Sequence, residues 1–180
     1  QVATFIAYVN LGTMALLLAA GVGGASAFWL PGGLALGVLV RFDRLAWPAI
    51  PLAAFAAYFV ATGDWPLAIA LAVGNTLEAI LGAALVDRVA GGAAVFRSAR
   101  TVFRFVAIAL VIAAITATLA TAVGMFTGSA WTGYGSVWMT WWLGNVAGLA
   151  LGTPLVRIAS ATPISMPTWR DALPILEGIA

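Results

Sequence analysis

Long runs of apolar residues, separated by short polar turns, recur along almost the whole chain. A helix needs roughly 20 apolar residues to cross a bilayer, whereas membrane β-strands show only about ten residues of strict alternation. The runs here are long and do not alternate. Since 63% of the residues are hydrophobic and only 8% are charged, no water-soluble core of this size could bury them. The sequence predicts an all-α, polytopic transmembrane helical bundle.

The apolar runs divide into about six expected spans, with the start of a seventh near the C-terminus. We expect them to form a single membrane-embedded domain over residues 1–180. Because the first run lacks a basic flank and a small-residue cleavage pattern, it is interpreted as a span and not as a signal peptide. The expected spans are residues 2–20, 25–40, 45–61, 66–86, 102–126 and 136–156, and residues 173–180 would begin the seventh.

All eight basic residues are arginines, and they fall in or beside the loops after the second, fourth and sixth expected spans. The intervening turns carry none. By the positive-inside rule the arginine side is cytoplasmic, which places the N-terminus inside the cell and predicts a multi-pass protein of the bacterial inner membrane. Topology therefore explains the basic residues, and we expect no nucleic-acid partner. The residues are Arg41, Arg44, Arg88, Arg97, Arg100, Arg104, Arg157 and Arg170.

The chain contains neither cysteine nor histidine. This excludes disulfides, thiol chemistry, ordinary zinc sites and the usual axial ligand of haem. We therefore expect no cofactor, no metal site and no catalytic residue.

Glu78 places a carboxyl group inside an apolar run. On a helix, Asn75, Glu78 and Gly82 share one face, so that face should point into the bundle and not toward lipid. An ionisable group within a span is by default a candidate functional residue. Three states of Glu78 remain open. It is protonated and donates to Asn10, Asn75 or Asn145; it awaits a cationic ligand or a proton; or its partner lies on helices outside this chain.

Asn145 should lie at the same membrane depth as Asn75. Each asparagine precedes a charged residue at the inner end of its span by twelve positions, namely Asp87 and Arg157. At about 1.5 Å per helical residue, both should lie roughly 18 Å from that end.

Tryptophans and glycines supply the remaining candidates. Trp29, followed by Pro and Gly, is either an interfacial anchor or a residue at the mouth of a cavity beside a shortened helix. Trp141 and Trp142 lie a turn or more inside the last expected span, so they either belong to an interfacial belt or wall a pocket. Glycines at 144, 148 and 152 form a ridge that would let another helix approach closely.

Four segments together resemble the MASE1 family: residues 29–36 (WLPGGLAL), residues 74–79 (GNTLEA) followed by 82–85 (GAAL), residues 138–145 (WMTWWLGN) and residues 148–155 (GLALGTPL). That family is a bacterial integral-membrane sensory domain at the N-terminus of histidine kinases, diguanylate cyclases and cyclic-di-GMP phosphodiesterases. The resemblance implies a non-enzymatic input module whose last helix drives a cytoplasmic output domain. Two departures stand out, because the family usually has about eight spans and often has Asp at the position of Asn145.

The residues and the resemblance together predict a sensory module. Its site would be built from Glu78, Asn75 and Asn145, with Trp29, Trp141 and Trp142 as its roof and Asn10 as a further polar partner. The alternatives are a small-molecule transport or substrate-binding subunit and a structural subunit of a larger membrane complex. Besides the lipid bilayer, a homodimer or a larger membrane assembly is compatible with the sequence.

Overall fold

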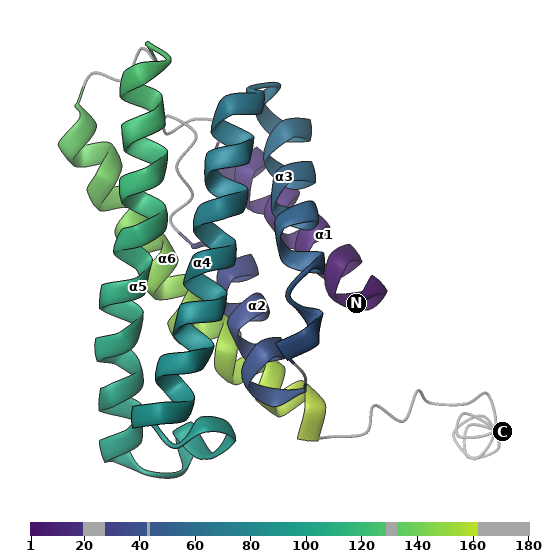
Figure 1. Ribbon diagram of the computed structural model, residues 1–180, viewed down its shortest axis with the longest axis vertical. Helices are drawn as coiled ribbons and strands as arrows, with labels where there is room; N and C mark the ends of the chain where they lie inside the picture. The colour runs from purple at the N-terminus through teal and green to yellow at the C-terminus, as the bar shows by residue number, and fades with distance from the viewer. Residues whose placement is uncertain (20–27, 43, 129–132, 162–180) are drawn as a thin grey trace, which may run out of the picture.

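The structure is a computed structural model that describes residues 1–19, 28–42, 44–128 and 133–161, and these residues form a helical bundle (Figure 1). No β-strand occurs in the described residues, as the all-α prediction requires. The helices are α1 (Val2–Ala19), α2 (Leu30–Arg41), the 3-10 helix η1 (Arg44–Ala46), α3 (Ala49–Thr62), α4 (Trp65–Val89), the 3-10 helix η2 (Gly92–Arg97), α5 (Ala99–Phe126) and α6 (Tyr134–Ala161).

Each of the six expected spans overlaps one α-helix, although α4, α5 and α6 extend beyond the expected bounds by up to five residues. Three helical segments are long and apolar enough to cross a membrane, namely Arg44–Thr62, α4 and α5, while Val2–Leu18 and α2 are shorter apolar helices. α6 has 28 residues, which exceeds the length that a span requires. The helical bundle is thus confirmed, whereas the number of spans stays a prediction. The expected seventh helix lies outside the described residues.

Local sequence explains where the helices begin and end. The α3–α4 turn combines Gly63, in the left-handed conformation at φ 69°, with Asp64, whose carboxylate accepts a hydrogen bond from the Leu67 N–H. Ser98 caps α5 in the same way through the Thr101 N–H. Pro31 lies in the first turn of α2, where its missing N–H costs nothing.

The short helix α2 is inserted among the longer ones. It occupies the half of the bundle near the C-terminal end of α4, and it packs against α6, α4 and α1 (Figure 1). The other main pairings are α1 with α3, α3 with α4, α4 with α5, and α5 with α6. With 12 residues, α2 is about 18 Å long, so it crosses only part of a bilayer core.

Backbone contact between α2 and α6 depends on glycine. A Cβ atom at Gly33 would lie 2.1 Å from the Gly148 carbonyl oxygen, and one at Gly148 would lie 2.0 Å from the carbonyl oxygen of Trp29. Gly152 meets the Gly33 backbone in the same way, and the Thr153 hydroxyl donates a hydrogen bond to the Gly33 carbonyl at 3.2 Å. α2 therefore packs against the predicted ridge of small residues on α6.

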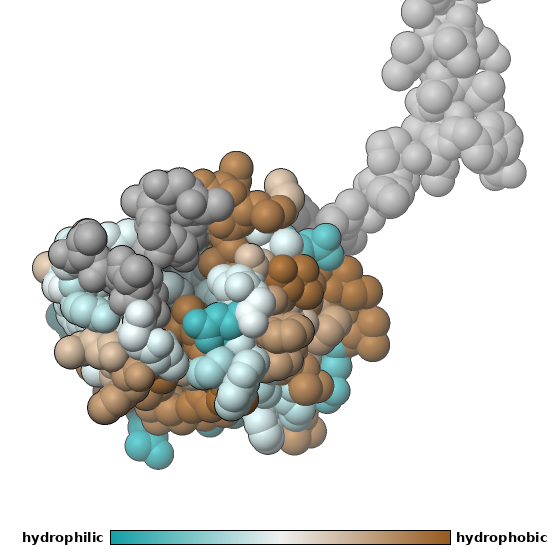
Figure 2. Space-filling model, turned by 90° about the horizontal axis from the view of Figure 1, so that it is seen from above, coloured by the Kyte–Doolittle hydropathy of each residue, from teal (hydrophilic) through white to brown (hydrophobic). Residues whose placement is uncertain are grey.

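The outer surface is apolar around the sides. Large hydrophobic side chains such as Leu18, Val60 and Val111 are more than half exposed. Figure 2 views the bundle along its long axis, with brown hydrophobic residues spread around the perimeter and paler or hydrophilic residues toward the middle. Lipid contact explains such a distribution, since apolar side chains around a helical bundle are at no disadvantage in hydrocarbon.

The seven described arginines gather at one end of the bundle, here called the arginine end: Arg41, Arg44, Arg88, Arg97, Arg100, Arg104 and Arg157. They belong to the C-terminal ends of α2, α4 and α6, the N-terminal end of α5, and the two 3-10 helices. Arg44 forms an ion pair with Asp87, and Arg104 donates to the Val89 carbonyl at 2.9 Å. The Gln1 amide donates to the Leu45 carbonyl at 3.0 Å, so α1 also starts there.

Gly148→Ala should separate α2 from α6, because the added methyl group would overlap the Trp29 main chain. Overpacking of this kind is expected to lower the free energy of unfolding by about 2 to 3 kcal/mol. Gly135→Ala is the matched control, since a Cβ atom at this α6 position meets no atom within 4 Å. Denaturant titration of both variants in detergent micelles measures the difference, and equal stabilities would refute the close α2–α6 contact.

Candidate functional site

Trp29 lies at the start of α2 and is only 3% exposed. Its main-chain N–H donates to the Gly144 carbonyl of α6 at 2.9 Å, and its indole Nε1–H donates to Asn75 Oδ1 of α4 at 2.6 Å. The Asn75 amide nitrogen in turn donates to the Leu71 carbonyl at 2.7 Å. Trp29 is therefore an internal residue that joins three helices, and its interpretation as an interfacial anchor is wrong.

Aromatic rings extend from Trp29 toward α3 and α6. The Trp29 and Tyr58 rings are stacked, with centroids 4.9 Å apart, and the Tyr58 ring stacks in turn on Trp141 at 6.1 Å. Tyr8 of α1 contacts Trp29 edge-on at 6.3 Å. Offset stacking and edge-on contacts are the favoured geometries of aromatic pairs. Four different helices or helix ends thus meet at one aromatic cluster.

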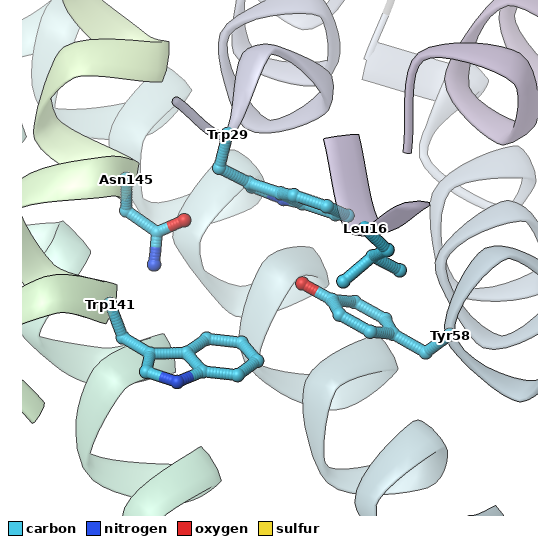
Figure 3. Close-up of a pocket in the computed structure, with 5 residues that line it drawn as sticks. All are labelled: Leu16, Trp29, Tyr58, Trp141 and Asn145. Carbon is cyan, nitrogen blue, oxygen red and sulfur yellow. The ribbon is translucent and has the colours of Figure 1, made fainter. Parts of the chain in front are cut away.

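A small cavity lies inside this cluster. It is lined by Leu16, Trp29, Tyr58, Trp141 and Asn145, and its volume is about 10 Å³. Figure 3 shows the Asn145 amide and the Tyr58 hydroxyl pointing into the space between the Trp29 and Trp141 rings. A cavity of this size is close to the minimum for one water molecule. A larger guest does not fit without rearrangement of the lining residues.

Glu78 lies one helical turn from Asn75 on α4 and is 1% exposed. Its Oε2 accepts a hydrogen bond from the Thr116 hydroxyl of α5 at 2.8 Å. Its Oε1 faces Gly32, where a Cβ atom would lie 3.0 Å from Oε1 and 3.3 Å from the Trp29 ring. The carboxyl group and the indole thus flank the same glycine, and together with Tyr8, Tyr58, Asn75, Thr116, Trp141 and Asn145 they make up one polar centre.

Four buried polar atoms of the polar centre have no hydrogen-bond partner among the described residues: Tyr8 Oη, Glu78 Oε1, Trp141 Nε1 and Asn145 Nδ2. Leaving a buried donor or acceptor unsatisfied costs about 1 to 3 kcal/mol each. Trp and Asn nitrogens donate, the tyrosine hydroxyl both donates and accepts, and the carboxyl group offers an acceptor or an acidic proton. The centre therefore has unused capacity for a small polar guest.

The part of the chain that the structure describes contains no group of three or more acidic, histidine or cysteine side chains that could hold a metal ion. Glu78 has no arginine beside it in that part of the chain, because the described arginines all lie at the arginine end. The polar centre is thus suited to hydrogen bonding and to charge compensation by a guest.

The structure brings five of the seven predicted site residues together: Trp29, Asn75, Glu78, Trp141 and Asn145. Asn75 accepts a hydrogen bond from the Trp29 indole, and Asn145 lines the small cavity together with Trp29, while their equal membrane depth stays a prediction. The two other residues lie elsewhere. Asn10 is exposed and its amide donates to the Ile6 carbonyl of its own helix at 2.8 Å. Trp142 stacks on Trp138 and donates to the Leu110 carbonyl at 2.8 Å.

Sequence reasoning missed three hydroxyl groups of the centre, those of Tyr8, Tyr58 and Thr116. A signal was present for the tyrosines, because the chain has only three and two of them fall within expected spans. A phenolic hydroxyl that is buried usually has a hydrogen-bond partner, so it marks a polar position. Thr116 carries no comparable signal, since threonine is frequent in this chain and commonly bonds to its own helix.

A family model, MASE1, matches residues 1–176 of the 180-residue chain. The chain belongs to the MASE1 family. This confirms the family that the four segments predicted, and it makes the chain a domain of a membrane-associated sensory family that is not catalytic. No curated protein and no solved structure matches the MASE1 chain.

The hydrogen bond between Trp29 and Asn75 should couple the two residues energetically. Trp29→Phe leaves Asn75 Oδ1 without its donor, and Asn75→Leu leaves the buried indole N–H without its acceptor. A double-mutant cycle on unfolding in detergent should give a coupling energy of about 1 kcal/mol, typical of hydrogen bonds between membrane helices. Trp65→Phe, at an exposed tryptophan of α4, should be additive with Asn75→Leu. Additivity of Trp29→Phe with Asn75→Leu would argue against the bond.

Proposed function

We propose that this MASE1 chain is the sensory input module of a bacterial signal-transduction protein and that the polar centre is its sensing site. The observation that supports the proposal is the set of four buried polar atoms without partners, gathered around an aromatic cluster and beside a single buried carboxyl group. Membrane proteins place ionisable groups at such depth mainly where they bind, carry or sense something.

The guest of this site would be small and polar, and either cationic or neutral. Glu78 favours a cation or a proton, because no cationic side chain of the described residues faces it. The Asn145 and Trp141 donors would bind an acceptor atom of a neutral guest. Only a water-sized molecule fits without rearrangement, since the cavity measures about 10 Å³.

Sensing would then be a shift between two packings of the bundle. In the structure the Tyr58 ring of α3 stacks on the Trp141 ring of α6, and both rings line the cavity. A larger guest would stabilise a second arrangement in which these rings separate. The free energy of this shift can be no larger than the difference between the guest's binding free energies for the two arrangements.

α6 is the element that would transmit the signal. It carries Trp141 and Asn145 in the centre and runs on to Arg157 at the arginine end. We propose that residues 1–180 act as one domain of the inner membrane, with the N-terminus and the arginine end cytoplasmic. The output domain would be a histidine kinase of a two-component system or an enzyme that makes or degrades cyclic-di-GMP, as the family resemblance implies.

Replacing the polar groups should alter signalling without unfolding the protein. In the full-length parent, Glu78→Gln and Asn145→Ala are each expected to change the basal output activity or its response to a stimulus by about fivefold or more, the lower range of measured allosteric couplings. Asp64→Asn is the matched control, because it makes the same change from acid to amide at the helix end, where Asn caps as well as Asp.

Output activity is normalised to the amount of folded protein in the membrane, so a loss of stability is not counted as a loss of sensing. Unchanged basal activity and unchanged responses in both Glu78→Gln and Asn145→Ala would remove the polar centre from the mechanism.

The orientation can be tested with single cysteines, since the chain has none of its own. Ala99→Cys at the arginine end should react with a membrane-impermeant maleimide only after the cells are permeabilised. Thr127→Cys, at the opposite end of α5, should react in intact cells after the outer membrane is opened. The reverse labelling pattern would place the arginine end outside the cytoplasm.

A transport or substrate-binding subunit is the second candidate, favoured by one feature of α2. This helix begins inside the bundle and leaves Trp29 beside polar groups, as discontinuous helices do at transporter binding sites. Counterflow of labelled small solutes in proteoliposomes separates the two functions, because a sensor moves no solute.

A further inference from the structure

A second cavity lies at the arginine end, away from the polar centre. Its volume is about 490 Å³, and three of its lining residues are arginines from three different elements: Arg41 at the end of α2, Arg97 in η2 and Arg157 near the end of α6. Gly91, Ala93 and Ala94 complete the lining that the structure describes. We call this space the arginine pocket.

Three positive charges line the arginine pocket, and the nearby Asp87 carboxylate, which approaches Gly92, is paired with Arg44. No acidic side chain lines it in the described part of the chain. Arg44 differs in this respect, because it forms an ion pair with Asp87 and lies outside the pocket. Three guanidinium groups around one cavity repel each other, and an anion placed among them would remove the repulsion.

Topology alone does not explain this arrangement. The positive-inside rule requires arginines near the ends of the spans, but it does not require them to converge. Here residues 41, 97 and 157 lie far apart in the sequence, and the fold of α2, η2 and α6 brings them to the same hollow. The other lining residues, at 91, 93 and 94, are small.

We propose that the arginine pocket binds the phosphate group of an anionic ligand. Guanidinium groups present planar pairs of N–H donors that match phosphate oxygens, and they form the stronger, charge-assisted type of hydrogen bond. Basic pockets between membrane helices at the cytoplasmic side commonly bind phospholipid headgroups. A soluble phosphate monoester offers the same chemistry, so the test includes both sources.

Ligand binding in the arginine pocket would hold the helices at the arginine end in one arrangement. The phosphate would connect the end of α2 and the η2 turn with Arg157, which is half-buried on α6. The pocket would thus respond to a different chemical signal from the polar centre while acting on the same helix. This proposal does not depend on the sensing role of Glu78.

The test uses the purified chain in a zwitterionic detergent, with short-chain phosphatidylglycerol as the lipid probe and glycerol phosphate as the soluble probe. Binding is measured as the shift of the thermal transition with probe concentration. Arg41→Gln, Arg97→Gln and Arg157→Gln should each raise the Kd about tenfold, as expected when a charge-assisted hydrogen bond is lost. Arg100→Gln is the matched control at the same end but outside the pocket, and it should change the Kd less than about twofold.

Arg97→Lys provides a second variant at an exposed position, where folding is not at risk. It keeps the charge but loses the planar fork, so its affinity should lie between those of the wild type and Arg97→Gln. Binding of the lipid alone, of glycerol phosphate alone, or of both would support the pocket and identify the source of the phosphate. Absence of binding by both probes would overturn the proposal, as would an equal loss of affinity in Arg100→Gln.

Discussion

Two hydrogen bonds donated by Trp29 hold the structure together at the point where α2 begins. The main-chain N–H reaches Gly144 of α6, and the indole N–H reaches Asn75 of α4. A helix that starts inside a membrane bundle exposes backbone donors that lipid cannot satisfy, so such a start exists only where neighbouring helices accept those bonds. Together with the glycine contacts to α6 and the Thr153–Gly33 bond, they fix the start of α2 between α4 and α6, where Gly32 faces the carboxyl group of Glu78.

α2 also connects the polar centre with the arginine pocket. Its first turn borders the polar centre, and its last residue, Arg41, lines the arginine pocket. α6 has the same relation to both, with Asn145 in the centre and Arg157 in the pocket. The two helices are in backbone contact where Gly33 meets Gly148. Both proposed sites therefore lie on a single pair of helices.

The site was predictable to the extent that it follows from depth and polarity. Glu78 and Asn75 were identified because polar groups in an apolar run must turn inward, and Asn145 because its distance from Arg157 matches that of Asn75 from Asp87. The position of a residue along the membrane normal does not determine which way its side chain points, however. Asn10 is also polar and lies within a helix, yet it faces outward and bonds to its own helix. Trp141 and Trp142 are neighbours, and only Trp141 points into the cavity.

The sequence by itself determined the all-helical fold, the collection of arginines at one end and membership in the MASE1 family, because each follows from local composition or from motifs read in order. Only the tertiary structure decided which side chains meet. The bond from Trp29 to Asn75 spans 46 positions, the bond from Thr116 to Glu78 spans 38, and the contact of Thr153 with Gly33 spans 120. Such pairs depend on how far each helix is rotated and how closely the glycines let the backbones approach. That information lies in the packing of the whole bundle and in no single segment.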